Sequence, residues 1–119
     1  MPVRDLVLDS TERTVEWAHE HLELGYADIA RSLGANRRTI HRWLNRESTP
    51  SRRYRNRMEK MRELRFLLEQ VFEDWDDALE WMYTPAPMLG GRTPISVMEE
   101  GELDEVVGVL AGFQSGAHA

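Results

Sequence analysis

The side chains of this sequence that are best suited to chemistry gather on one predicted helix, and the chemistry they suit is anion binding. Ile40, Trp43 and Leu44 are spaced i, i+3 and i+4, so they face inward on a helix over about residues 37–46. The outward positions are Arg37, Arg38, Thr39, His41 and Arg42. Arginines in a first helical turn oppose the helix macrodipole, which favours acids there. A phosphate or a base edge beside this turn would account for them.

A second short helix, over about residues 26–33, must position this one. Gly34 ends it, because glycine takes the left-handed turn conformation without a Cβ penalty. Asn36 is a good N-cap for the helix that follows. The helix-turn-helix pattern needs a small residue, a glycine four positions later, and apolar residues six and nine positions after the glycine. Here these are Ala30, Gly34, Ile40 and Trp43.

A long helix is predicted next, to about residue 72, with Thr49 as N-cap and Pro50 at its first position. Its first turn holds Arg52 and Arg53, and we expect these two, together with Arg37 and Arg46, to contact phosphates. On the preceding helix we expect Arg38, Thr39 and Arg42 at base edges. His41 suits either role. The complete predicted DNA interface is Asn36, Arg37, Arg38, Thr39, His41, Arg42, Arg46, Arg52 and Arg53.

The distribution of charge supports this interface, although the chain as a whole has a net charge of −6. Residues 1–30 carry a net −5, residues 31–65 a net +9, and residues 66–119 a net −10. A basic block between two acidic ones indicates one surface for a polyanion and another for a basic partner. The alternative is pairing of acids and bases within the fold, but the basic block has three acids for twelve bases.

Length and composition exclude several classes of protein. The 119 residues suffice for one or two small domains. We expect no membrane span, because no run of about 18 apolar residues occurs. We also expect no signal peptide, because the N-terminal segment MPVRDLVLDS is short and mixed in character. The lack of cysteine excludes disulfides and the common zinc fingers. His19 and His21 point to different sides of a helix, so we expect exposed histidines rather than a metal site. A cytoplasmic location follows as the default.

The flanking segments are also predicted to be helical. Asp9 should cap a helix over about residues 10–23, with Glu12 three positions later. The acids of residues 73–77 should cap another helix, which stops before Pro85. Proline and glycine residues then make a loop, and a short helix restarts with Thr93 as N-cap and Pro94 in its first turn. A last helix should occupy about 102–113, followed by a loose tail over 114–119.

Two stretches resemble known families. The helix-turn-helix spacing resembles the Xre-type DNA-binding repressors. Residues 78–94 are similar to the C-terminal toxin-binding domain of Xre/MbcA/ParS-type antitoxins, a resemblance that extends over about residues 67–114. The matching residues are Ala78, Trp81, Thr84, Pro85, Pro87, Leu89, Gly90, Gly91, Thr93 and Pro94. Two further motif positions differ, with Met82 where leucine is usual and Ala86 where asparagine is usual.

The resemblance implies a partner, namely a toxin encoded beside this chain, most often of the RES type, which consumes NAD. In that family the C-terminal domain covers the toxin, and its end can block the entrance to the active site. The contact candidates carried over are Trp81, Leu89, Gly90, Gly91, Arg92, Gln114, Ser115, Gly116, Ala117, His118 and Ala119. A core tryptophan and plain loop geometry are the alternatives for Trp81 and for the glycines.

We therefore expect an all-α fold of about seven helices, with a DNA-binding domain over residues 1–66 and a toxin-binding domain over 67–119. The expected function is an antitoxin that represses its own operon as a homodimer, since paired half-sites need a dimer. We expect no cofactor. A stand-alone dimeric repressor and a partition protein that spreads on DNA are the alternatives. An enzyme is disfavoured, because the sequence shows no nucleophile–base pair, metal set or phosphate loop.

Overall fold

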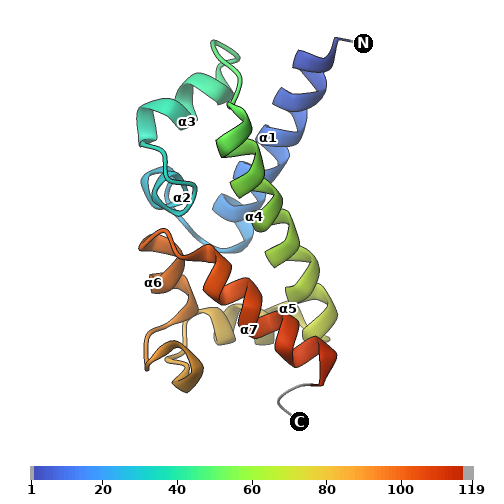
Figure 1. Cartoon of the computed structure of the whole chain (residues 1–119), viewed down its shortest axis with the longest axis vertical. Helices are drawn as coiled ribbons and strands as arrows, with labels where there is room; N and C mark the ends of the chain where they lie inside the picture. The colour runs from blue at the N-terminus through green and yellow to red at the C-terminus, as the bar shows by residue number, and fades with distance from the viewer. Residues whose placement is uncertain (1, 117–119) are drawn as a thin grey trace. The chain divides into compact units, whose positions relative to one another are not determined.

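The computed structural model describes residues 2–116 and confirms the all-α fold. This part of the chain contains seven α-helices, one short 3-10 helix and no strand (Figure 1). In chain order the elements are α1 (Val3–His21), α2 (Tyr26–Ser32), α3 (Arg37–Leu44), α4 (Arg52–Val71), α5 (Trp75–Met82), η1 (Pro87–Leu89), α6 (Pro94–Glu99) and α7 (Leu103–Ser115).

The chain divides into two compact units, Met1–Glu59 and Lys60–Ala119. This division and the predicted boundary after residue 66 both fall inside α4. In the first unit α1, α2 and α3 pack against one another. Their shared core includes Leu8, Val15, Trp17, Leu22, Ile29, Leu33, Ile40 and Trp43, all of them buried.

α1 begins at Val3, seven residues before the predicted start, so the assignment of Asp9 as its N-cap is wrong. The apolar stripe explains the earlier start. Val15 and Leu22 lie on the buried face, and that face continues back through the buried Thr11 to Leu8. A helix that starts at Val3 places Leu8 on this buried face, and it is two turns longer than predicted at this end. α1 then ends at His21, earlier than predicted.

The turn between α2 and α3 has the predicted geometry. Gly34 has a φ of +72°, the left-handed conformation expected after α2. Asn36 caps α3, and its side-chain oxygen accepts a hydrogen bond from the Thr39 backbone N–H at 2.9 Å. Ile40 and Trp43 are buried beneath the helix, while Leu44 is half-buried. The inward face of α3 is therefore the predicted one.

α4 starts at Arg52, so Thr49 is not its N-cap and Pro50 is not its first residue. The Arg55 N–H donates to the carbonyl of Ser51 at 2.9 Å, which makes Ser51 the residue that precedes the helix. Pro50 is buried in the preceding turn, where its carbonyl accepts from the Arg55 guanidinium at 3.1 Å. Along α4 the buried side chains are spaced at helical intervals, at Met58, Met61, Leu64 and Leu68.

In the second unit, the helices begin at the predicted capping residues, but the C-terminal end differs from the prediction. Asp74 accepts from the Asp76 N–H and begins α5. Thr93 accepts from the Ser96 N–H and begins α6, with Pro94 in its first turn. α7 packs against α6 and continues to Ser115. The predicted loose tail is therefore wrong for residues 114–115, which form the last turn of that helix.

Candidate functional site

The exposed face of α3 carries a set of basic side chains. Arg37, Arg38 and Arg42 are exposed, and Thr39 and His41 are half-buried. Among the ion pairs of residues 2–116, none involves these three arginines. Their charges are therefore not neutralised by this part of the chain. Such a helix face fits the major groove of DNA, where arginine can donate two hydrogen bonds to guanine.

The polar residues at the start of α3 are already hydrogen-bonded to one another. The Asn36 side-chain oxygen accepts from the Thr39 hydroxyl at 3.0 Å, in addition to the backbone bond of the cap. The Arg37 Nε donates to the His41 Nε2 at 3.2 Å. Asn36 thus has a structural role at the helix start. Arg38 and Arg42, one helical turn apart, are exposed arginines of the same face that take no part in these bonds.

Tyr26 links the helix-turn-helix to α1. Its hydroxyl donates to the Glu16 carboxylate at 2.9 Å, and its ring stacks on His19, with 4.4 Å between ring centroids. Partial burial and this hydrogen bond raise the pKa of the Tyr26 phenol above its ordinary value. The ring also contacts His41 of α3, with centroids 5.7 Å apart. Tyr26 therefore helps to fix the orientation of α3 against α1.

The first turns of α4 hold two kinds of arginine. Arg52 and Arg53 are exposed, and the Arg53 guanidinium lies 5.7 Å from the centre of the Tyr54 ring. Arg57 instead points back to α2, where its Nη1 donates to the Leu33 carbonyl at 3.1 Å. Arg52 and Arg53 thus remain candidates for phosphate contacts, whereas Arg57 stabilises the turn of the helix-turn-helix.

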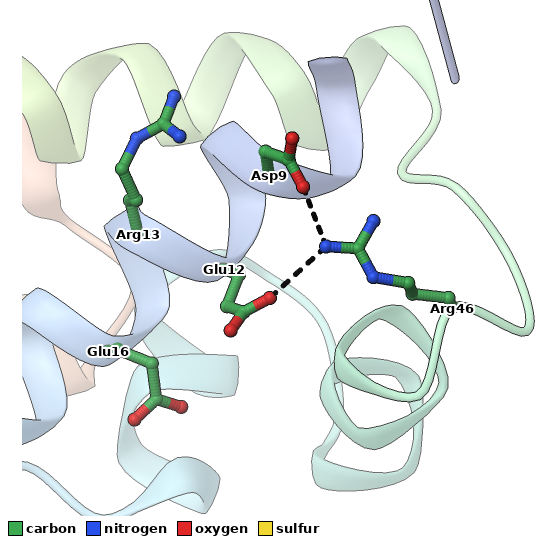
Figure 2. A pocket seen from close by; sticks show the side chains of 5 residues that line it. All are labelled: Asp9, Glu12, Arg13, Glu16 and Arg46. Carbon is green, nitrogen blue, oxygen red and sulfur yellow. Dashed lines mark hydrogen bonds and ion pairs between the residues drawn. The ribbon is translucent and has the colours of Figure 1, made fainter. Parts of the chain in front are cut away.

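Arg46 follows α3 and has a different environment from the other predicted DNA contacts. Its Nη2 donates to Asp9 at 2.6 Å and to Glu12 at 3.3 Å, both on α1 (Figure 2). These carboxylates, Asp9 first, raise the pKa of Arg46 above its ordinary value. The Arg46 carbonyl in turn accepts from the Arg4 guanidinium at 2.6 Å. In this arrangement Arg46 holds the end of α3 against α1.

The acids around Arg46 belong to a groove along α1. The groove has a volume of 430 Å³ and is lined by Asp9, Glu12, Arg13, Glu16 and Arg46 (Figure 2). The sequence had indicated a capping role for Asp9 and Glu12, and no local pattern pointed to a pair formed with a residue more than thirty positions away. This ion-pair cluster is the part of the first unit that sequence reasoning missed.

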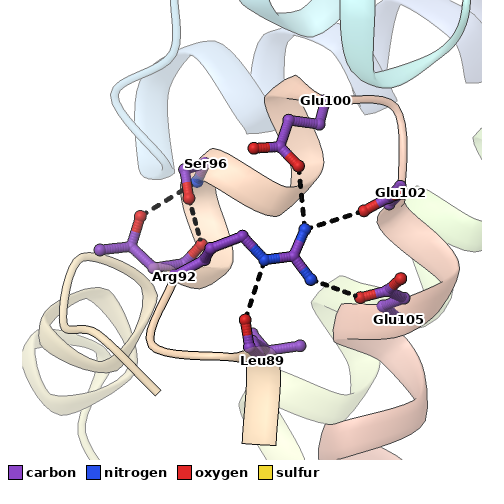
Figure 3. Close-up of polar contacts among 7 residues, drawn as sticks. Leu89, Arg92, Ser96, Glu100, Glu102 and Glu105 are labelled. Atoms are coloured by element: carbon purple, nitrogen blue, oxygen red, sulfur yellow. Dashed lines mark hydrogen bonds and ion pairs between the residues drawn. The ribbon is translucent and has the colours of Figure 1, made fainter. Parts of the chain in front are cut away.

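In the second unit, Arg92 is the centre of the corresponding cluster. Its guanidinium donates to Glu100 at 2.9 Å, to Glu102 at 3.0 Å and to Glu105 at 3.0 Å (Figure 3). Its Nε donates to the Leu89 carbonyl at 2.9 Å. The carboxylates, Glu102 first, raise the pKa of Arg92 above its ordinary value. Arg92 thereby ties the loop after η1 to the turn between α6 and α7.

The predicted contact residues near Arg92 have distinct positions. Leu89 is buried, with 3% of its surface exposed. Gly90 and Gly91 are exposed, with φ values of +68° and +82°, and an added Cβ would meet nothing within 4 Å at either. Loop conformation therefore explains these glycines. Trp81 is half-buried between Phe72 and Phe113, with centroids 6.0 Å from each.

Two exposed apolar side chains beside this loop were missed by the sequence interpretation. Tyr83 is 44% exposed, and Met88, in η1, is 45% exposed. An isolated apolar residue carries no sequence signal of exposure, since its neighbours in space decide whether it is buried. Together with Gly90 and Gly91, they make the surface around η1 the most suitable apolar contact area near the predicted residues.

The predicted contacts at the C-terminal end are only partly described. Gln114 and Ser115 lie in the last turn of α7, where the Ser115 hydroxyl donates to the Gly112 carbonyl at 3.0 Å. Gly116 ends the helix with a φ of +77°. The predicted contacts Ala117, His118 and Ala119 lie outside the described residues.

The described residues contain no candidate membrane span and no candidate metal cluster. None of the helices is long and apolar enough to cross a membrane. Among residues 2–116, no group of three or more histidines and carboxylates is arranged to hold a metal ion. His19 and His21 are both exposed, as expected, and the His19 Nδ1 lies 2.8 Å from the Leu24 carbonyl.

Comparison with known proteins gives matches for both units. Residues 67–116 match the model of the antitoxin Xre/MbcA/ParS C-terminal toxin-binding domain. Residues 25–68 match the family of gpP-like terminase ATPase subunits. That segment contains α2, α3 and most of α4, and within it the structure has no strand, glycine-rich loop and helix of the kind that binds nucleotide phosphates. The second match is therefore a likeness of the helix-turn-helix region.

Curated relatives and a solved structure agree with the first match. The chain is 27% identical over 103 residues to the mycobacterial cidal antitoxin MbcA of Mycobacterium tuberculosis and to that of Mycobacterium bovis, which covers 87% of this chain and 90% of each relative. A chain of the crystal structure of the M. tuberculosis MbcT–MbcA toxin–antitoxin complex is also similar. Its TM-score is 0.58 at 27% identity, over 87% of this chain and 92% of that chain.

Proposed function

We propose that the chain is an antitoxin that binds and neutralises a toxin protein encoded beside it, because residues 67–116 match the antitoxin Xre/MbcA/ParS C-terminal toxin-binding domain. The observation that carries the proposal is the family match of the second unit. Its support is the similarity to MbcA, which extends over 87% of the chain. We assign the toxin to the RES type, which consumes NAD, because that is the partner the resemblance implies. The antitoxin itself is proposed to be non-catalytic.

We place the toxin contacts on the second unit, around η1 and at the end of α7. Tyr83, Met88, Gly90 and Gly91 are exposed there and form a surface of apolar and backbone groups. Arg92 is assigned a positioning role, because its four hydrogen bonds fix this loop. Trp81 supports the end of α7 through its ring contact with Phe113. The C-terminal residues Gln114, Ser115, Gly116, Ala117, His118 and Ala119 remain contact candidates.

The same chain is proposed to repress its own operon in the cytoplasm. Arg38 and Arg42 would donate to base edges, and Arg37, Arg52 and Arg53 would bind phosphates. Thr39 and His41 supply further donors at the start of α3. A homodimer is part of the proposal, because helix-turn-helix proteins read two half-sites about 34–36 Å apart. Arg46 is the weakest of the predicted phosphate contacts, since Asp9 and Glu12 already bind it.

Co-expression tests the antitoxin function directly. The tagged chain is produced together with the product of the adjacent gene, and that product is also expressed alone in a growth assay. We expect the two proteins to co-purify, and growth to stop only when this chain is absent. A harmless neighbour that does not co-purify would refute the antitoxin function.

The exposed basic face of α3 supports a second candidate function, a dimeric repressor without a toxin partner. It shares every DNA contact with the first proposal, so DNA binding alone does not distinguish them. Affinity for the promoter fragment should fall steeply between about 50 and 200 mM salt if the arginines displace phosphate counterions. Equal affinity for unrelated duplexes would instead favour a partition protein that spreads on DNA.

A further inference from the structure

A small cavity lies where α4 ends and α5 begins, apart from the surface around η1. Its volume is 220 Å³. The buried side chains of Leu68 and Ala78 form its floor, and the half-buried rings of Phe72 and Trp75 line it. The exposed carboxylates that complete the lining are Glu69, Glu73 and Asp74. The cavity therefore combines an apolar base, aromatic walls and an acidic rim.

The acids of this rim are only partly neutralised. Glu69 accepts from the Arg65 Nε at 3.1 Å, and so has a cation of its own. Asp74 accepts from the Asp76 N–H at 3.0 Å, a bond to backbone that leaves its charge in place. Among the ion pairs of residues 2–116, none includes Glu73 or Asp74. Two carboxylates beside the aromatic walls are thus without a cationic partner from this part of the chain.

The segment after residue 65 is poor in positive charge. Arg92 is its single arginine or lysine, against eleven acids. It is bound by Glu100, Glu102 and Glu105. Arg92 is therefore already engaged elsewhere, which leaves the rim charges available to a cation of another molecule.

We propose that this cavity receives an arginine side chain of the bound toxin, a proposal that rests on the antitoxin function above. A guanidinium stacks on aromatic faces and forms paired hydrogen bonds with carboxylates, which matches rings and acids in one cavity. At 220 Å³ the cavity is smaller than the roughly 300–1,000 Å³ of sites for drug-sized ligands, so it suits a single side chain. Glu73 and Asp74 would bind the guanidinium, and Trp75 would cover its flat face.

The test compares two double variants for affinity to the product of the adjacent gene. Glu73→Gln with Asp74→Asn removes both rim charges, and asparagine preserves the N-cap of α5. Asp77→Asn with Glu80→Gln removes the same number of charges from α5 outside the cavity lining. We expect the rim variant to bind at least tenfold more weakly, and the control within about threefold of the parent chain, since charge-assisted bonds are the strong ones. Equal affinity of the two variants would overturn the proposal.

If no toxin binds, the proposed antitoxin function is refuted. A second measurement then tests the arginine site without the toxin. The full chain, labelled with ¹⁵N, is titrated with a blocked Gly-Arg-Gly peptide and with its citrulline counterpart, which has no charge. We expect the arginine peptide, but not the citrulline peptide, to shift the NMR signals of the Trp75 indole and of the backbone amides of 72–78. In the rim variant, the arginine peptide should no longer cause these shifts. Shifts that are absent, equal for both peptides, or unchanged in the rim variant would refute an arginine site.

Discussion

The Arg57 guanidinium occupies the space where a β-carbon on Gly34 would stand. From there its Nη1 donates to the Leu33 carbonyl at 3.1 Å, and so joins α4 to the end of α2. Gly34 is therefore fixed by two constraints, its left-handed backbone and the approach of Arg57. The turn of the helix-turn-helix is held from a third helix.

We expect Gly34→Ala to lower the free energy of unfolding by about 1–2 kcal/mol, because a side chain in the left-handed region is strained by that amount. Displacement of Arg57 adds to the loss. For a chain of this size the melting temperature should fall by several degrees. The control is Gly108→Ala within α7, where an added Cβ meets nothing within 4 Å. It should be neutral or slightly stabilising, and an equal fall for both variants would contradict the role of the turn.

The helix-turn-helix was predictable because its signals are local. Gly34, Asn36, Ile40 and Trp43 act within one or two turns of the chain, through backbone conformation, capping and helical periodicity. The bond from Arg57 to Leu33 spans 24 positions and has no such signature. Sequence patterns therefore predicted the elements of the turn but not the contact that fastens it.

The errors at helix ends have the same origin. Asp9 is a good capping residue by type, yet the buried position of Leu8 requires α1 to continue past it, and Arg46 then binds its side chain. Pro50 is suited to a first helical turn, yet it is buried and its carbonyl binds Arg55. In both cases burial or a distant partner outweighed a local preference.

The candidate sites divide in a similar way. Residue type and spacing placed Arg38 and Arg42 on the exposed face of α3. They did not separate these arginines from Arg46, which has two carboxylates beside it. Only the three-dimensional arrangement distinguishes a base with partners in the fold from one without.

We expect Arg46→Gln to lower the melting temperature at low salt and to have less effect at high salt, because its ion pairs with Asp9 and Glu12 are exposed and screened. DNA affinity should change little. Thermal unfolding at about 20 mM and 500 mM salt, with promoter binding alongside, checks both points. A variant that loses DNA affinity but keeps its stability would make Arg46 the phosphate contact first predicted from the sequence.

Substitutions on the basic face should separate base contacts from phosphate contacts. Arg42→Gln should cost about 1–3 kcal/mol of binding to the operator and much less with an unrelated duplex, since a base contact carries the specificity. Arg52→Gln should weaken binding to the operator and to the unrelated duplex alike. It should also reduce the slope of log affinity against log salt concentration by about one. Binding curves at several salt concentrations distinguish the two patterns.

The matched control for these variants is Arg13→Gln, which removes the same charge from α1 outside the predicted interface. Its DNA affinity should stay close to that of the parent chain. If all three variants weakened binding equally, general electrostatic attraction would explain the data, and the assignment of α3 to the major groove would be wrong.

Arg92→Gln should loosen the loop that Arg92 fastens. Three glutamates would then lie together without their cation, and repulsion between them would open the turn. The loop is otherwise closed by backbone bonds, from Gly91 N–H to the Ala86 carbonyl and from Ala86 N–H to the Arg92 carbonyl, both 3.0 Å. Hydrogen exchange of these two amides should accelerate, and toxin affinity should fall with it.

The control for Arg92→Gln is Lys60→Gln, which removes one exposed ion pair, with Glu63, from α4. We expect it to leave the exchange of the loop amides unchanged. Added salt should partly restore protection in the Arg92 variant, because screening reduces the repulsion among the glutamates. Unchanged exchange in the Arg92 variant would show that the backbone bonds alone hold the loop.

Two truncations separate the structural and the contact roles of the C-terminal end. Removal of 117–119 leaves the residues of α7 and Gly116 in place, and we expect it to weaken toxin neutralisation through lost contacts, with the melting temperature checked alongside. Removal of 114–119 also deletes the last turn of α7, with the bond from Ser115 to the Gly112 carbonyl, and should lower the melting temperature. Growth rescue and thermal unfolding are measured for both.

If the shorter truncation neutralises the toxin fully and the longer one does so at a temperature where it stays folded, residues 114–119 make no contact that matters. The toxin would then be held by the surface around η1 and the cavity between α4 and α5.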